Sequence, residues 1–100
     1  MADAQLQLEM ARMEAELSAL VTDCDLPLQD ANAIRAYLEH KELGVALEAL
    51  CDTLIESESA ITETQLRRIL DAAKAMGMLT REPKAWSERM EALLSRTEPG

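Results

Sequence analysis

The side chain best suited to catalysis is His40, the only histidine among 100 residues. A histidine can act as a general base near neutral pH, and this one lies beside Glu39 and Glu42 in a polar stretch. No catalytic motif surrounds it, and a histidine near a helix C-terminus commonly caps the helix or faces solvent. Only three glycines are present, and they form no phosphate-binding loop. The sequence therefore predicts that the protein is not an enzyme; an enzyme or metal protein centred on His40 is the alternative.

A metal or redox site is the next chemistry to consider, because Cys24 and Cys51 are thiols. They have neither Cys-x-x-Cys spacing nor a histidine cluster, and a structural zinc ion needs four ligands. Glu48 and Glu56 are placed to share a helical face, but di-iron bundles need repeated Glu-x-x-His motifs, which one histidine cannot supply. We expect no metal and no cofactor, and two cysteines in the core of a protein from a reducing compartment.

Acidic residues dominate the charge of this chain. Nineteen Asp and Glu against ten Lys and Arg give a net charge of −9. That balance argues against direct binding to nucleic acid or to an anionic membrane, because both need clustered cations. Residues 37–63 are the most acidic part, with seven acids and one base. The explanations that remain are a basic partner surface and plain solubility.

Three acids in this part repeat at helical spacing. Glu48, Asp52 and Glu56 are four residues apart, and like charges at that spacing oppose helix formation. No Lys or Arg on the same face relieves them. The pattern predicts either a solvated helix face or a face that meets an external cation. Neutralisation across the bundle by a later helix is a third possibility. The basic residues of that helix are Arg67, Arg68 and Lys74.

The elements that position these residues are predicted to be helices. Leu and Ala supply most of the apolar residues, and three Gly with three Pro are too few for an all-β fold. Apolar periodicity predicts an all-α fold, a compact bundle of about five short-to-medium helices in one domain over residues 1–100. The expected helices cover about 26–39, 43–56, 63–76 and 83–96, after a first helix over 3–22. The tail, 97–100, is expected to fray.

Capping residues set several of these boundaries. Asp25 is a predicted N-cap, with Pro27 in the first turn. Thr62 and Gln65 have the spacing of a capping box. Gly77 is expected to follow the end of the same helix as its C′ residue.

The first predicted helix carries an apolar seam in which spacings of four and three alternate. Its members are Leu6, Met10, Met13, Leu17 and Leu20. We expect the seam to pack within the domain. The alternative is pairing with a second copy, which would make the protein a homodimeric helical adaptor. The N-terminal segment is acidic and no apolar run could span a bilayer, which predicts a cytoplasmic protein.

The central run YLEHKELGVALEALCD, from Tyr37 to Asp52, resembles the core of the MafI-type immunity proteins. These are small acidic helical partners of bacterial polymorphic toxins. The matching elements are Tyr-x-Glu-His, Ala-Leu-Glu-x-Leu-Cys-Asp, a later Ile, a helix and a Met-Gly ending, all within residues 34–78. Lys41 stands where that family usually has Gly, and Leu43 where it commonly has an aromatic residue.

This resemblance implies an immunity protein that binds a cognate toxin domain and protects the producing cell or its siblings. The toxin domain is expected to be basic, so that an acidic surface complements it. The implied contacts are Glu48, Asp52 and Glu56 at the mouth of the toxin's active site, with a polar rim of Glu39, Glu42 and Glu58. Binding at an exosite is the alternative to plugging the active site. A monomer in a 1:1 complex is expected.

Overall fold

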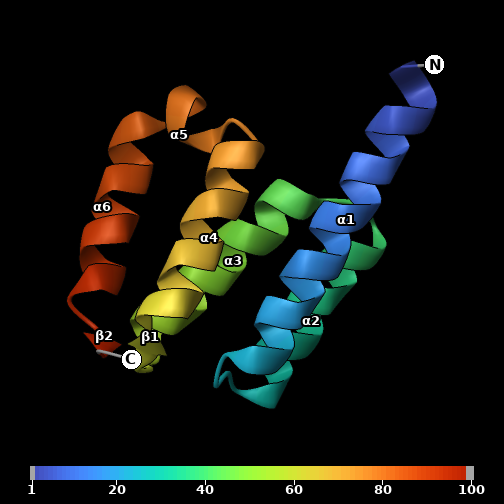
Figure 1. Ribbon diagram of the computed structural model, residues 1–100. Coiled ribbons are helices and arrows are strands. Elements are labelled where there is room, and N and C mark those ends of the chain that lie inside the picture. The colour runs from blue at the N-terminus through green and yellow to red at the C-terminus, as the bar shows by residue number, and fades with distance from the viewer. Residues whose placement is uncertain (1, 99–100) are drawn as a thin grey trace.

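A computed structural model describes residues 2–98 of the chain. Over this range the fold is helical, apart from two very short strands, and all five predicted helices form (Figure 1). The helices are α1 (Ala2–Asp23), α2 (Leu28–Glu39), α3 (Leu43–Glu56), α4 (Glu63–Ala75), α5 (Met78–Arg81) and α6 (Pro83–Leu94). The sequence does not predict α5, because four residues are too few to show a hydrophobic period.

Helix α3 lies at the centre of the fold, and α1, α2, α4 and α6 all contact it. In Figure 1 the α1–α2 pair lies on one side of α3, and α4 with α6 lies on the other. The buried residues of α3 are Leu43, Ala46, Leu47, Leu50, Cys51 and Leu54. The flanking helices add Leu20, Ile34 and Trp86 to the same core. Because one face of α3 is committed to this core, the opposite face is held outward.

The starts of α2 and α4 are built differently. Thr62 and Gln65 form the predicted capping box, in which each side chain accepts a hydrogen bond from the other residue's backbone N–H, at 3.1 and 3.0 Å. At α2 the prediction is wrong, because Pro27 is the N-cap residue and no side chain caps the helix. Proline disfavours helical backbone in the preceding residue, so α2 cannot begin at Leu26, as an Asp25 cap requires.

Left-handed backbone occurs at three turns, at Lys41, Glu58 and Gly77. Gly77 follows α4 with a φ of +71°, as predicted for a C′ residue. Lys41, between α2 and α3, has a φ of +61°, which costs a residue with a side chain about 1–2 kcal/mol. The Lys41 ammonium pairs with Glu14 of α1 at 2.7 Å. The turn before Leu43 therefore adopts the conformation that suits Gly and is tied to α1 by an ion pair.

The C-terminal segment is ordered further than predicted. Residues Thr97–Glu98 form β2, which pairs in parallel with β1 (Ile61–Thr62). The Ile61 N–H also donates to the Arg96 carbonyl at 3.3 Å, and Ile61 is buried. The prediction of fraying is therefore wrong for residues 97–98, because burial of Leu93 in α6 brings the following residues beside β1. Residues 99–100 lie outside the described residues.

Candidate interaction surface

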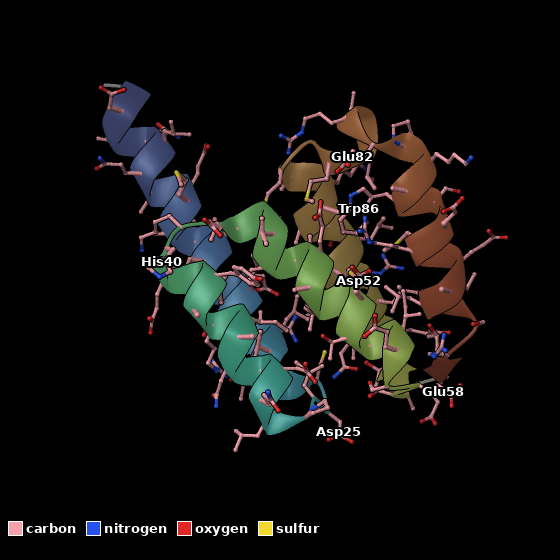
Figure 2. All side chains as sticks on the ribbon, turned by 180° about the vertical axis from the view of Figure 1, so that it is seen from behind. Asp25, His40, Asp52, Glu58, Glu82 and Trp86 are labelled. Atoms are coloured by element: carbon pink, nitrogen blue, oxygen red, sulfur yellow. The ribbon has the colours of Figure 1, made fainter. Side chains whose placement is uncertain are left out.

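The outward face of α3 carries three carboxylates in a row. Glu48, Asp52 and Glu56 lie on the side of α3 away from its buried residues; Asp52 and Glu56 are exposed, and Glu48 is partly buried. Figure 2, which views the molecule from behind, shows Asp52 on the near side of α3. Neighbouring members of the row are about 6 Å apart along the helix axis. The predicted central set is thus assembled on one face.

The three predicted rim residues lie before and after α3 in the chain, outside the row itself. Glu39 ends α2, Glu42 is the N-cap residue of α3, and Glu58 follows α3 with a φ of +54°. All three are exposed. Because α3 has 14 residues, its ends are about 21 Å apart. Only Glu48, Asp52 and Glu56 form a band along the outward face of α3, because Glu39 instead lines a groove between α1 and α2. We call this surface the α3 acidic band.

A cation from α6 reaches the middle of the band. The Arg89 Nε atom lies 3.2 Å from Asp52 Oδ1, and the guanidinium stacks 5.0 Å from the centre of the Trp86 ring. The expectation that the row lacks an internal cation is therefore wrong at Asp52. Sequence reasoning missed Arg89 because 37 residues separate it from Asp52, and no local spacing signals the contact. Glu48 and Glu56 have no ion pair within residues 2–98.

One expectation was that the basic residues of α4 neutralise this band. They do not. Arg68 instead binds α1, with its Nε 2.7 Å from Glu16 Oε1 and one terminal nitrogen 2.8 Å from Asp23 Oδ2. Hydrogen bonds to these two carboxylates raise the pKa of Arg68. Gln65 adds a hydrogen bond to the Asp23 carbonyl at 3.0 Å. These contacts fix α4 along α1, so Arg68 pairs with α1 and not with the α3 acidic band.

The residues considered for catalysis or metal binding lie apart. His40 is exposed at the C-cap of α2, where its backbone N–H bonds to Ala36. Cys24 and Cys51 are buried free thiols, as predicted. Burial raises the pKa of Cys24 to about 11 and that of Cys51 to about 12, so both thiols stay protonated at neutral pH. Within residues 2–98, no group of three His, Cys, Asp or Glu could hold a metal ion.

The apolar seam of α1 is divided between the core and the surface. Leu17 and Leu20 are 1% and 0% exposed, Met13 is partly buried, and Leu6 and Met10 are 57% and 40% exposed. The expectation that the seam packs within the domain is therefore correct only for its C-terminal part. The exposed part is a second candidate surface for contact with another chain.

Comparison with known proteins gives no family: no family model, curated protein or solved structure matches this chain. None of the described helices combines the length and the apolar character needed to cross a membrane. The two surfaces therefore have to be interpreted from their own residues.

Proposed function

We propose that this chain is a MafI-type immunity protein that binds a cognate bacterial toxin domain in the cytoplasm and neutralises it. The protein binds as a monomer in a 1:1 complex, through the α3 acidic band. One observation carries the proposal: three carboxylates form a row on the outward face of the helix whose other face forms the centre of the core. The resemblance of residues 34–78 to immunity proteins and the net charge of −9 support it.

The stability cost of the band also supports a binding role. The last turn of α3 contains Glu56 and no basic residue, although a negative charge at a helix C-terminus opposes the helix dipole. Glu48 and Asp52, four residues apart, repel each other by a few tenths of a kcal/mol, and Arg89 beside Asp52 offsets part of this repulsion. A row of acids that weakens its own helix is explained by a cationic partner, which would reverse the sign of these interactions.

Inhibition by this surface needs no chemistry from the immunity protein. The packed inner face of α3 fixes the backbone that carries the carboxylates before binding, so little backbone entropy is lost on association. A toxin domain that acts on nucleic acid must bind phosphates with Lys and Arg. The row of carboxylates, led by Glu48 and Glu56, would occupy those cations and exclude the substrate.

Charge reversal in the band tests the proposal. The variant Glu48→Lys/Glu56→Lys leaves the Asp52–Arg89 pair intact. We expect it to weaken binding to the purified cognate toxin domain by about 100-fold or more, because like charges at an interface cost several kcal/mol. Calorimetry measures the affinity, and growth during co-expression of the toxin measures protection.

Asp71→Lys/Glu91→Lys is the matched control, because it makes the same change in net charge at exposed positions of α4 and α6. We expect this control to bind within about threefold of the wild type, since net charge alone acts mainly through screened long-range attraction. Equal weakening by both variants would show that only the overall charge matters. Full binding by the band variant would move the interface away from α3.

A homodimeric helical adaptor is the second candidate function, and the exposure of Leu6 and Met10 is the observation that favours it. Light scattering of the purified chain separates the two functions. A monomer is expected for the immunity protein, and a stable dimer that Leu6→Ser dissociates would support the adaptor.

A further inference from the structure

Helix α1 extends past the helix that covers its seam. It has 22 residues and spans about 33 Å, whereas α4 has 13 and spans about 20 Å. Contacts at Asp23, Glu16 and Ala75 show that α4 runs antiparallel to α1, from the C-terminal end of α1 toward its middle. Figure 1 shows the first turns of α1 standing clear of the other helices. The N-terminal half of the seam therefore lacks the cover that α4 gives to the rest.

An apolar groove begins where α4 ends. Its volume is about 530 Å³, and it runs between α1, the start of α3 and the end of α4. We call it the α1 groove. Its apolar lining residues are Leu6, Met10, Met13, Leu43, Ala75 and Met76. Burial of Leu17 and Leu20 fixes α1 against the other helices, so the groove is formed before any partner binds.

Within the bundle, cations from other elements pair with the acids that flank this seam. On one flank of the seam, Arg68 of α4 binds Glu16 and Asp23, which are seven residues apart. On the other flank, Lys41 binds Glu14 at 2.7 Å. The elements that pack against α1 thus bring cations to the acids that border its apolar residues.

The same acidic flank continues into the uncovered half. Glu9 precedes Glu16 by seven residues, so it lies on the same flank of the seam, and it lines the α1 groove together with Glu16 and one cation, Arg12. No ion pair to Glu9 exists within residues 2–98. A helix lying beyond Met76, in line with α4, would meet apolar residues below it and a carboxylate at its edge.

A second copy of this chain fits the groove poorly. If two α1 seams paired in antiparallel fashion, Glu9 and Glu16 would face the same flank of the other copy. In a parallel pair, Glu9 would face Glu14. Either arrangement brings like charges together, between two chains that each carry a net charge of −9. The charges therefore favour a cationic occupant over self-association.

We infer that the α1 groove binds a cationic amphipathic helix of another protein. Apolar anchors of that helix face Leu6 and Met10, and a Lys or Arg pairs with Glu9. Unbranched methionine side chains let such a groove adapt to the anchors. Helix α1 is at the front in Figure 1, whereas Asp52 of the α3 acidic band is at the front in the opposite view of Figure 2. The groove is thus a separate surface, and the inference does not depend on the proposed function.

Binding of a synthetic helical peptide to the full chain, measured by fluorescence anisotropy, tests this inference. The probe carries Leu along one face and Lys beside it, and a second peptide carries Glu in place of Lys. We expect micromolar affinity for the Lys peptide and binding at least about tenfold weaker for the Glu peptide. Leu6→Ser/Met10→Ser should weaken binding by about tenfold or more, and Glu9→Lys by about threefold.

Two control variants locate the effect. Leu28→Ser/Leu94→Ser removes two exposed leucines from α2 and α6, and we expect its affinity to stay within about twofold of the wild type. Glu48→Lys/Glu56→Lys, in the α3 acidic band, should retain most of the binding. Absence of binding, or equal binding by Leu6→Ser/Met10→Ser, would overturn the inference. So would a wild-type dimer in light scattering that this double variant converts to monomer, because the occupant would then be a second copy.

Discussion

The α3 acidic band and the α1 groove are both surfaces of amphipathic helices, but the fold treats the two helices differently. Helix α3 is packed along its whole length, so its inner apolar face is buried and its outward face, which carries the acids and the exposed Val45, reaches solvent. Helix α1 is packed over its C-terminal part, so the same apolar seam is core at Leu17 and surface at Leu6. A periodic apolar pattern therefore predicts which face of a helix can pack against other elements. The neighbouring elements decide which part of that face is covered.

The acidic residues differ in the same way: some are paired with a cation of the fold, and others are not. The acids beside the covered half of the α1 seam have cations supplied by the fold, as at Glu16 and Arg68. In the α3 acidic band, the fold supplies Arg89 to Asp52, and Glu48 and Glu56 have no ion pair within residues 2–98. Glu56 is exposed and Glu48 is partly buried, so an external partner can reach the acids that the fold leaves without an ion pair.

The largest effect is expected when one side chain at each end of the α1 seam is shortened to alanine. We expect Leu17→Ala to lower the free energy of unfolding by about 2–5 kcal/mol, because it leaves a cavity in the core. Leu6→Ala should change it by less than about 0.5 kcal/mol, since the side chain is already in solvent. Urea denaturation measures both. Similar losses for the two variants would mean that the N-terminal half of α1 is covered in solution.

Removal of the cation in the α3 acidic band should have a smaller effect. Arg89→Gln loses the ion pair with Asp52 and the stacking on Trp86, and we expect a loss of about 1 kcal/mol in unfolding free energy. A double-mutant cycle with Asp52→Asn isolates the ion pair, whose coupling should be about 0.5–1 kcal/mol and should fall with added salt. A coupling of zero at low salt would show that Arg89 acts only through Trp86.

The smallest effect is expected at the turn between α2 and α3. Lys41→Gly relieves left-handed backbone at a φ of +61° and removes the exposed ion pair with Glu14. The relief is worth about 1 kcal/mol and the ion pair a few tenths, so we expect a net gain of about 0.5 kcal/mol in thermal or urea unfolding. Lys41→Ala, which keeps the strain and loses the pair, is the control. A loss for Lys41→Gly as large as that for Lys41→Ala would contradict the strain argument.

Much of the secondary structure was predictable because its signals are local. The α3 boundaries, the Thr62–Gln65 capping box and the left-handed Gly77 all follow from residues within a few positions of one another. The Asp25 cap failed because a competing local effect, the restriction that Pro27 places on its neighbour, prevails there. The segment of Thr97 was missed because its order depends on a strand 36 residues earlier.

In the candidate site, too, only the local features were predictable from the sequence. Spacing alone placed Glu48, Asp52 and Glu56 on one face, since helical periodicity fixes which residues share a side. Spacing could not show that Arg89 reaches that face or that Arg68 turns away from it to α1. Those contacts depend on how whole helices are arranged around the core.

By itself, the sequence determined the five longer helices, their apolar and acidic faces, and the net charge of −9. These properties are set by interactions within a turn or two of helix and by composition. Only the tertiary structure decided that α4 covers just part of α1, which leaves Leu6 and Met10 exposed. It also decided that the cation paired with Asp52 comes from α6 and not from α4. The physical reason is that covering and ion pairing act between surfaces distant in sequence, and their outcome depends on helix lengths and packing that no local pattern records.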